Sequence, residues 1–285
     1  MCITEWSEKD GVVFMISIIT AIYNQRAVNE LYFENLQRFT HHPFELIIID
    51  NGSNDGSADF FESVGAKVIR NGVNYSYPYS QNQGIALAQY DWLAFLNNDI
   101  IVSPDWDLRL IASMEKNELD VATVCGIEQV ENAAATKKLK RRWKKVKNLL
   151  GLFGFNRTTL QLMHRWMYGD WIKFNTDRTC RFASQIKEGF VGNTVIIQRK
   201  ALAKIGLWDE RLQAGDFDLY LRTKQRAEQV GDMKPMHICL DVFNHHYIRL
   251  TIKAGYPPFA DRENLITMDD KWSAAERLAF DRLNK

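Results

Sequence analysis

ELIIIDNGSNDGS, residues 45–57, joins a short apolar strand directly to a polar turn. The run from Leu46 to Ile49 is continuous rather than alternating, which is typical of a strand that is buried on both faces of a parallel sheet. Asp50 ends the strand, and the Asn-Gly and Asp-Gly pairs that follow it favour turns. Because ligands of open α/β sheets bind beyond the carboxyl ends of the strands, we expect a site at this edge.

Strands and helices alternate along the chain on both sides of this stretch. The predicted elements are strands at VVFMISIIT (12–20), AKVIR (66–70) and DWLAFLNND (91–99), and helices at VNELYFENLQRF (28–39) and SQNQGIALAQY (80–90). This alternation predicts an α/β fold with a doubly wound, mostly parallel, Rossmann-like sheet. Three strands end in polar clusters, at 20–24, 50–57 and 97–99, and we expect all three to open onto one crevice.

The second half of the chain is less regular. The pattern fades between residues 126 and 187 and returns with a strand and helix at 192–206, a loop and helix at 207–226, and a late strand at 236–247. We therefore predict a single domain over 12–250, followed by a helical C-terminal extension at 251–285. Within the domain, we expect a ligand-binding half at 12–125, a helical insertion with a basic amphipathic segment at 126–187, and an acceptor-binding and catalytic half at 188–250.

The composition and the N-terminal residues indicate the cellular compartment and the kinds of partner that the protein need not have. The net charge of +1 does not require a nucleic-acid or membrane partner, and no apolar run reaches the roughly 18 residues of a transmembrane helix. The N-terminal MCITEWSEKDG is polar and acidic, unlike a signal peptide. Cys2, Cys125, Cys180 and Cys239 form no C-x-x-C pair, which favours free thiols in a reducing compartment. We therefore expect a cytoplasmic protein.

Two strand-end aspartates are candidates for ligand contacts. Asp50 occupies the position where an acidic side chain commonly binds the ribose or base of a nucleotide, although a strand-to-helix turn alone would also explain it. Asp99 follows two asparagines, and a carboxylate among oxygen donors suits Mg²⁺ or Mn²⁺, with a capping turn as the alternative. The chain has neither a G-x-G-x-x-G fingerprint after its first strand nor a P-loop, so a nucleotide would be held in another way.

A basic segment, KKLKRRWKKVKNLLGLFGF (137–155), lies inside the irregular region, with eight Lys or Arg among its first eleven residues. It could be a solvated charged helix, an amphipathic segment that lies on an anionic membrane, or a contact for nucleic-acid phosphates. If the segment is functional, residues 137–153 would contact the acceptor or an anionic surface. If that surface is a membrane, the protein would lie peripherally at the inner membrane face. The residues we single out are Lys140, Arg141, Arg142, Trp143 and Lys144, with Trp143 available for stacking.

Several motifs together resemble the family-2 glycosyltransferases, which have the GT-A fold. They are SIITAIYNQ, ELIIIDNGSNDGS, NQGIALA, WLAFLNNDI and AGDFDLYLR, and they occur in the family's order and approximate spacing. The resemblance covers residues 14–125 and 189–250. It implies a metal-dependent, inverting transfer of a sugar from a nucleotide-diphosphate sugar to an acceptor hydroxyl.

The resemblance also implies residue roles. FLNND resembles the family's D-x-D element, so Asp99 would bind the metal, while Asn97 replaces the first acid. AGDFDL resembles the family's Glu-Asp-x-Asp-Leu, so Asp216 would be the catalytic base and Asp218 the second acid, while Gly215 replaces the glutamate. In the family a histidine near the late strand binds metal or diphosphate. Here this points to His245 or His246, and the spacing to Thr251 favours His246.

The predicted donor pocket gathers residues from the strand ends and from the helix at 80–90. It consists of Thr20, Ala21, Tyr23, Asn24, Asp50, Asn51, Asn82 and Asn97. A nucleotidyltransferase is the alternative enzyme, although TAIYNQRAVNE lacks the Gly-rich loop such enzymes carry after the first strand. The other alternative is a non-catalytic module of the same fold that binds sugar or nucleic acid.

Overall fold

The computed structural model of the protein describes residues 15–248 and 255–281. The first residues of the strand predicted at 12–20, the predicted boundary between 250 and 251, and Thr251 lie outside the described residues. No helix within the described ranges is long and apolar enough to cross a membrane.

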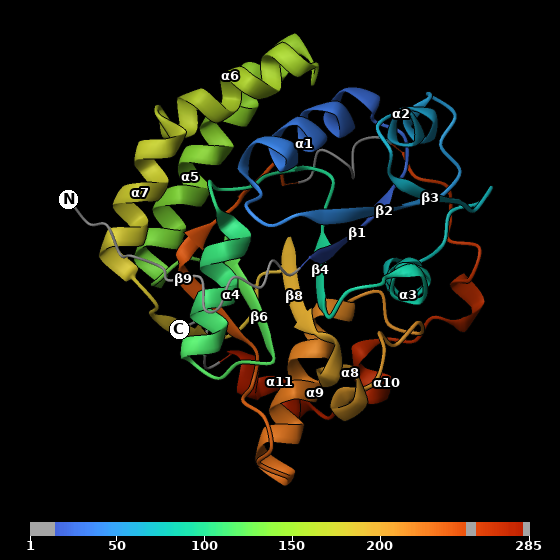
Figure 1. Ribbon diagram of the computed structural model, residues 1–285, viewed down its shortest axis with the longest axis vertical. Helices are drawn as coiled ribbons and strands as arrows, with labels where there is room; N and C mark the ends of the chain where they lie inside the picture. The colour runs from blue at the N-terminus through green and yellow to red at the C-terminus, as the bar shows by residue number, and fades with distance from the viewer. Residues whose placement is uncertain (1–14, 249–254, 282–285) are drawn as a thin grey trace.

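The centre of the molecule is a mixed sheet of eight strands (Figure 1). In spatial order these are β3 (Lys67–Arg70), β2 (Phe44–Asp50), β1 (Ile16–Ile22), β4 (Trp92–Leu96), β8 (Thr194–Gln198), β6 (Val121–Cys125), β9 (His237–Phe243) and β7 (Ile186–Glu188). The first four are mutually parallel, β6 is parallel to β9, and β8 and β7 run antiparallel to their neighbours. A small second sheet pairs β5 (Ile100–Ile101) with β10 (His245–His246). The prediction of a mostly parallel α/β sheet is therefore confirmed.

Helices cover both faces of this sheet, as Figure 1 shows for α1 and α2 on one side of β1–β3 and α3 on the other. The helices are α1 (Arg26–Phe39), α2 (Ser57–Ser63), α3 (Tyr77–Leu87), α4 (Trp106–Lys116), α5 (Ala133–Leu150), α6 (Arg157–Tyr168), α7 (Trp171–Phe182), α8 (Arg199–Ile205), α9 (Gly215–Gln229), α10 (Met268–Lys271) and α11 (Ala274–Asp281). Short 3-10 helices lie at Gly151–Phe153 and Arg262–Asn264.

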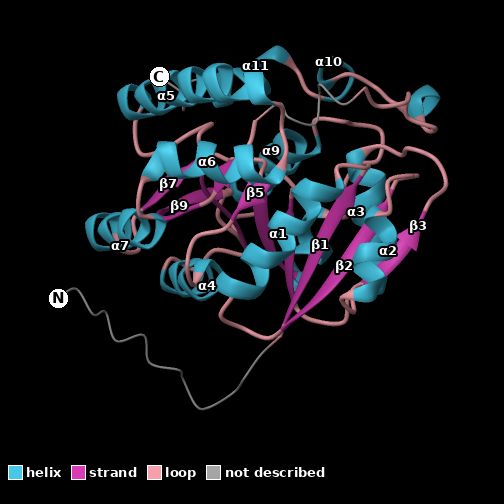
Figure 2. Ribbon diagram, turned by 90° about the horizontal axis from the view of Figure 1, so that it is seen from above, coloured by secondary structure: helices cyan, strands magenta, loops and turns pink. Residues whose placement is uncertain are grey.

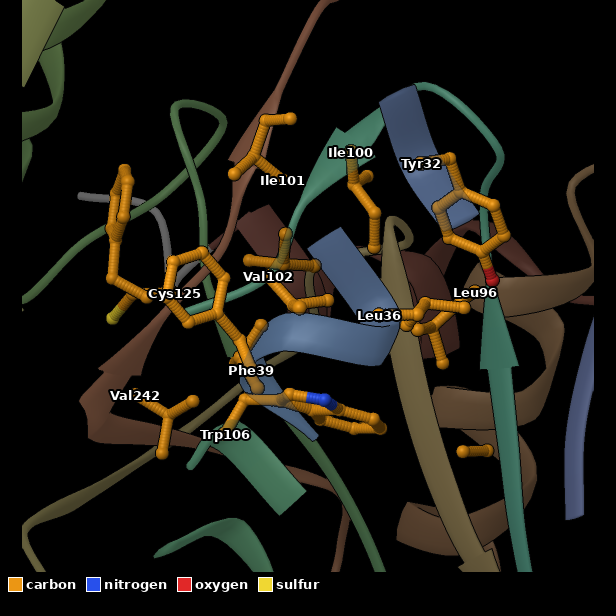
Figure 3. Close-up of a cluster of buried hydrophobic side chains, with 14 of the residues drawn as sticks. Tyr32, Leu36, Phe39, Leu96, Ile100, Ile101, Val102, Trp106, Cys125 and Val242 are labelled. Carbon is orange, nitrogen blue, oxygen red and sulfur yellow. The ribbon is translucent and has the colours of Figure 1, made fainter. Parts of the chain in front are cut away.

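Two apolar cores hold these layers together, one on each face of the sheet. Successive side chains of β1 alternate between them, so that Ile18 packs into the core under α1 and Ile19 into the core under α3. Figure 3 shows part of the first core, where Leu36 of α1 lies near Leu96 at the end of β4 and Trp106 of α4. Apolar burial on both faces explains why these strands are continuous apolar runs in the sequence.

The helical insertion predicted at 126–187 contains three helices, α5, α6 and α7. Each begins at a side-chain cap, because Asn132, Asn156 and Asp170 accept a backbone N–H from the first turn of α5, α6 and α7 respectively. Figure 2 shows α7 beside β7 and β9, at the opposite side of the molecule from β3. The three helices thus enlarge the fold on the side of β9.

Candidate active site

The three predicted polar clusters are joined by hydrogen bonds at the carboxyl ends of the strands. The amide of Asn24 donates to Ser53 Oγ over 2.7 Å, and the amide of Asn54 donates to Asn24 Oδ1 over 2.9 Å. Asn98 Nδ2 donates to Asn29 Oδ1 over 2.7 Å, and Asn29 Nδ2 donates to the carbonyl of Asn24 over 2.9 Å. The ends of β1, β2 and β4 are therefore neighbours, as predicted, and Asn98 links the third cluster to the first.

Two residues of the predicted sugar-donor pocket make contacts that fix the local structure. Thr20 is fully buried, and its hydroxyl lies 2.6 Å from the Tyr32 hydroxyl on α1. Asp50 is buried, and its carboxylate accepts the amide of Ser53 over 3.2 Å, which holds the turn after β2. Their roles in donor binding stay predictions.

Two side-chain amides of the predicted sugar-donor pocket connect loops. Asn51 Nδ2 donates to Ser80 Oγ over 3.0 Å, which ties the end of β2 to α3. Asn82 Nδ2 donates to the carbonyl of Trp208 and to Glu210, and Asn82 Oδ1 accepts the amide of Trp208. Asn82 therefore clamps the loop that leads to α9.

The remaining residues predicted at the end of β1 differ in environment. Ala21 packs against the core on the α3 face. The Tyr23 ring lies 5.2 Å from that of Tyr256, centroid to centroid, so the chain near Tyr256 covers this strand end.

A cavity of 830 Å³ lies between α5, the loop before β8 and the start of α9. Among the predicted residues it brings together Asn97, Asp216, His246, Lys140, Arg141 and Lys144. Its other lining residues include Glu128, Lys137, Lys187, Gly192 and Asn193. The other predicted residues, including Asp99, Asp218 and His245, do not line this cavity.

Asp216 stands in the first turn of α9, on the wall of the cavity. Its Oδ1 accepts the amide of Phe217 over 2.9 Å, and an acid in this position is favoured by the helix dipole. Burial raises the pKa of Asp216 above its ordinary value, and the nearby negative charge of Glu128 adds to the shift. The result is a fixed carboxylate that binds a proton more readily than an exposed aspartate does.

Two glycines make room for Asp216 and its helix. A Cβ on Gly192 would lie 1.9 Å from Asp216 Oδ2, so only glycine allows the carboxylate its observed position. A Cβ on Gly215 would lie 2.9 Å from the side chain of Pro78 and 3.1 Å from the ring of Trp208. Packing by these two residues therefore fills the space that the family's glutamate would need.

Asp218 is fully buried on the other side of α9 and serves as the centre of a charge network. It pairs with Arg222 over 2.8 Å and with Lys271 over 2.7 Å, and it accepts the indole N–H of Trp272 over 2.8 Å. These contacts attach α10 to α9. They favour a structural role, and the predicted catalytic role of Asp218 stays a prediction.

The predicted histidine pair is divided between two environments, because adjacent residues of β10 point to opposite sides. His245 is fully buried among aromatic rings, with Tyr168 OH 2.9 Å from its Nδ1 and the Trp143 ring 5.2 Å away. Burial holds the pKa of His245 well below its ordinary value. His245 therefore belongs to the core, and His246 is the member of the pair that lines the cavity.

His246 bridges two carboxylates. Its Nε2 lies 3.0 Å from Asp99 Oδ1, and its Nδ1 is hydrogen-bonded to Glu128. Burial disfavours the charged imidazole, but Asp99 and Glu128 outweigh it and raise the pKa of His246 well above its ordinary value. Asn193 Nδ2 donates to the other oxygen of Glu128 over 3.2 Å and fixes that carboxylate.

The Asp99–His246 pair fits a divalent metal. Asp99 and His246 lie 3.0 Å apart as an ion pair, and a carboxylate with an imidazole is a ligand combination that Mn²⁺ accepts. A carboxylate on the second nitrogen, as Glu128 provides, is the usual support of a metal-binding histidine. In the described part of the chain no three His, Cys, Asp or Glu side chains form a complete metal site, so the remaining ligands would be water and substrate oxygens.

The basic segment forms α5, and its side chains divide between cavity and core. Lys140, Arg141 and Lys144 line the cavity, whereas Arg142 donates to the carbonyl of Trp166 on α6. Trp143 is buried against His245, so the prediction that it offers a stacking surface is wrong.

Sequence reasoning did not single out several cavity residues, among them Glu128, Lys137, Lys187 and Gly192. Lys137 belongs to the predicted basic run, and its helical spacing to Lys140, Arg141 and Lys144 was the available signal. Glu128 and Gly192 carry no local signal, since each is defined by a partner far away in the sequence.

Comparisons with known proteins identify relatives. The family model described as glycosyl transferase family 2 matches residues 17–204. An uncharacterized glycosyltransferase of Haemophilus influenzae is 33% identical over 104 residues, which are 36% of this chain and 35% of that protein. The uncharacterized glycosyltransferase YfnE of Bacillus subtilis is 28% identical over 246 residues, covering 73% of this chain and 60% of YfnE.

A solved structure supports the fold. The mannosyltransferase PcManGT from Pyrobaculum calidifontis, in complex with GDP-Man and Mn²⁺, superposes with a TM-score of 0.54 at 12% identity, covering 86% of this chain and 59% of that one. At this identity the likeness shows the fold alone. The chain spans about a third of the length of the first curated relatives it matches.

Proposed function

The chain belongs to glycosyltransferase family 2 and has the family's GT-A fold, and from this premise we propose that it moves a sugar from a nucleotide-diphosphate sugar to an acceptor hydroxyl with inversion. The observation that carries the proposal is the cavity in which the Asp216 carboxylate faces the same space as Asn97 and His246. A general base and a diphosphate-binding edge on one cavity are what an inverting transfer needs.

In the proposed mechanism Asp216 is the general base. It accepts the proton of the acceptor hydroxyl while the hydroxyl oxygen bonds to the anomeric carbon and the nucleoside diphosphate leaves with the electrons of the broken bond. The raised pKa of Asp216 strengthens it as a base, and the amide of Phe217 together with the close approach of Gly192 holds its orientation. Asp218 supports α9 from behind and does not touch the reacting atoms in this mechanism.

A divalent cation, Mn²⁺ or Mg²⁺, would be held by Asp99 and His246 and would supply positive charge to the departing diphosphate. Glu128 has a positioning role in this arrangement. By accepting the Nδ1 proton of His246 it would leave Nε2 as the metal-binding nitrogen once a cation displaces the proton that Nε2 shares with Asp99, and it fixes the plane of the ring.

The nucleoside would lie at the ends of β1 and β2. Tyr23, Asn24 and Asp50 stand there, and the hydrogen bonds through Asn29 and Asn98 connect this edge to the end of β4. A donor bound in this way would extend from β1 toward Asn97 and present its sugar to the cavity.

A thermal-shift screen of nucleotide sugars, with and without Mn²⁺, tests the proposal directly. A ligand that binds only the folded protein raises the melting temperature, so the true donor should stabilise the chain, and more strongly with the metal. Slow release of nucleoside diphosphate from that donor, lost in Asp216→Asn, would establish an enzyme. If no nucleotide sugar stabilises the protein or is hydrolysed, the proposal is wrong.

A further inference from the structure

We propose that the acceptor is a polyanionic chain, carrying phosphate or carboxylate groups, whose negative groups bind a row of cations on α5. This inference rests on the proposed function, because it names the chemical class of the acceptor. It starts from the charge of the cavity, which has five Lys or Arg side chains and only two carboxylates, Glu128 and Asp216, on its walls. Glu128 is already bonded to His246.

The row is a single face of one helix. Lys137, Lys140, Arg141 and Lys144 follow the three- and four-residue spacing that places side chains on one side of an α-helix. All four line the cavity, and no carboxylate of the described residues forms an ion pair with them. Lys187, which belongs to β7, is the fifth cation of the same cavity.

The helix is anchored, so the row has a defined position. Trp143, Val146 and Leu150 on the other side of α5 are buried, and the Trp143 ring packs against His245. Asn132 caps the first turn by accepting the amide of Ala135 over 2.8 Å. A helix held along one side in this way presents its cations to the cavity without the entropy cost of ordering a mobile segment.

The length of the row argues for a chain of negative groups rather than for the donor diphosphate alone. From Lys137 to Lys144 the helix rises by about 10 Å, which is longer than one pyrophosphate. The donor diphosphate also has its own proposed position at Asp99 and His246, which lie outside α5. The charge is local, because the whole chain carries 36 Lys or Arg against 35 Asp or Glu.

The test compares two double variants of α5 that remove the same charge. K140Q/K144Q alters the cavity row, and K138Q/K145Q alters lysines of the same helix that do not line this cavity. The probes are inorganic polyphosphate, poly-L-glutamate, pyrophosphate with Mn²⁺, neutral dextran and vesicles containing phosphatidylglycerol. Affinity is measured by calorimetry at several salt concentrations, with thermal melting as the check of folding.

We expect at least one of the two polyanions to bind the wild-type protein, and neutral dextran to show no binding. K140Q/K144Q should weaken that binding at least about tenfold and reduce the slope of log affinity against log salt by about 1.4, since each lost contact accounts for about 0.7. K138Q/K145Q should change the affinity less than about twofold, because Lys138 and Lys145 are not part of the row that lines the cavity.

Three outcomes would overturn the inference. The first is equal loss of polyanion affinity in both double variants, which would indicate a diffuse charge effect. The second is a loss of pyrophosphate binding in K140Q/K144Q as large as the loss for the polyanion, which would assign the row to the donor. The third is binding to vesicles without binding to either polyanion, which would assign it to a membrane. Because none of these measurements requires turnover, failure of sugar-nucleotide hydrolysis would count against the proposed function alone.

Discussion

Replacing Gly192 by alanine should disable the proposed base without removing it. The new Cβ would lie 1.9 Å from Asp216 Oδ2, whereas ordinary contact begins at 3.4 Å, so the carboxylate must shift by about 1.5 Å. Gly192 does not need a left-handed backbone, so alanine introduces no backbone strain of its own. The effect of the substitution is therefore confined to the position of one carboxylate.

The expected loss follows from that displacement. A misplacement of about 1 Å at a reacting group costs on the order of a hundredfold in rate, and loss of a general base costs about 10² to 10⁴. We therefore expect the kcat of Gly192→Ala to fall by about 10² to 10³ while donor affinity stays within about twofold. The measurements are steady-state release of nucleoside diphosphate and calorimetric titration of the donor.

A double-variant cycle shows whether Gly192 acts through Asp216. If alanine acts only by moving this carboxylate, G192A/D216N should be no slower than Asp216→Asn. The reason is that Asp216→Asn already removes the carboxylate that Gly192→Ala displaces. Gly151→Ala is the matched control, since Gly151 follows the end of α5, does not line the cavity, and its Cβ would meet only the Phe155 ring, at 3.2 Å. Turnover of Gly192→Ala within twofold of wild type, in a protein that melts normally, would refute the reasoning.

Three further predictions concern pH, stability and metal binding. Because a base works only when deprotonated and burial raises the pKa of Asp216, turnover should be lost as pH falls through a value above the ordinary 3.8; a pH–rate profile that stays flat down to pH 3.8 would contradict this. Asp218→Ala should lower the free energy of unfolding in urea by about 3 kcal/mol, because it removes the carboxylate that pairs with Arg222 and leaves the buried indole N–H of Trp272 without its acceptor. Asp59→Asn at an exposed pair should cost less than about 1 kcal/mol, and equal losses would remove the structural role. Glu128→Ala should weaken Mn²⁺ binding about 10- to 100-fold in calorimetry. Glu128→Gln should weaken it much less, because glutamine can still accept the His246 proton. Unchanged Mn²⁺ affinity in the alanine variant would exclude the positioning role of Glu128.

The half of the fold that was predictable is the half whose strands are buried on both faces. β1, β2 and β4 consist mostly of apolar residues, and such continuous apolar runs indicate strands that are buried on both faces of the sheet. The 126–187 segment was predicted as a helical, basic insertion, but the bounds of its helices were not predicted, for the opposite reason. In α5 only Trp143, Val146 and Leu150 are buried, and the cations between them conceal the helical period of the apolar residues.

The site shows a similar division. Asp99 could be selected from the sequence because it ends a strand, whereas Asp216 and the histidine pair were selected because their motifs resemble those of the family. The spacing to Thr251 favoured His246 over His245, and in the structure His246 is the one that lines the cavity, since alternation along β10 sends one of any adjacent pair to the other side. Gly192 could not be selected, because the contact that gives it importance joins the loop before β8 to the first turn of α9, which the sequence does not relate.

The two departures from the family pattern have a common consequence for charge. Asn97 replaces an acid on the cavity wall, and Gly215 replaces an acid next to Asp216, where Pro78 and Trp208 now fill the space. Each departure removes a negative charge from a region that α5 makes strongly positive. In a cavity that admits water an added carboxylate would repel an anionic ligand over a distance of about 8 Å at physiological salt. The missing acids and the cation row therefore act in the same direction. Both would favour the proposed polyanionic acceptor, while Asp216 stays at the position where the proposed mechanism needs a base.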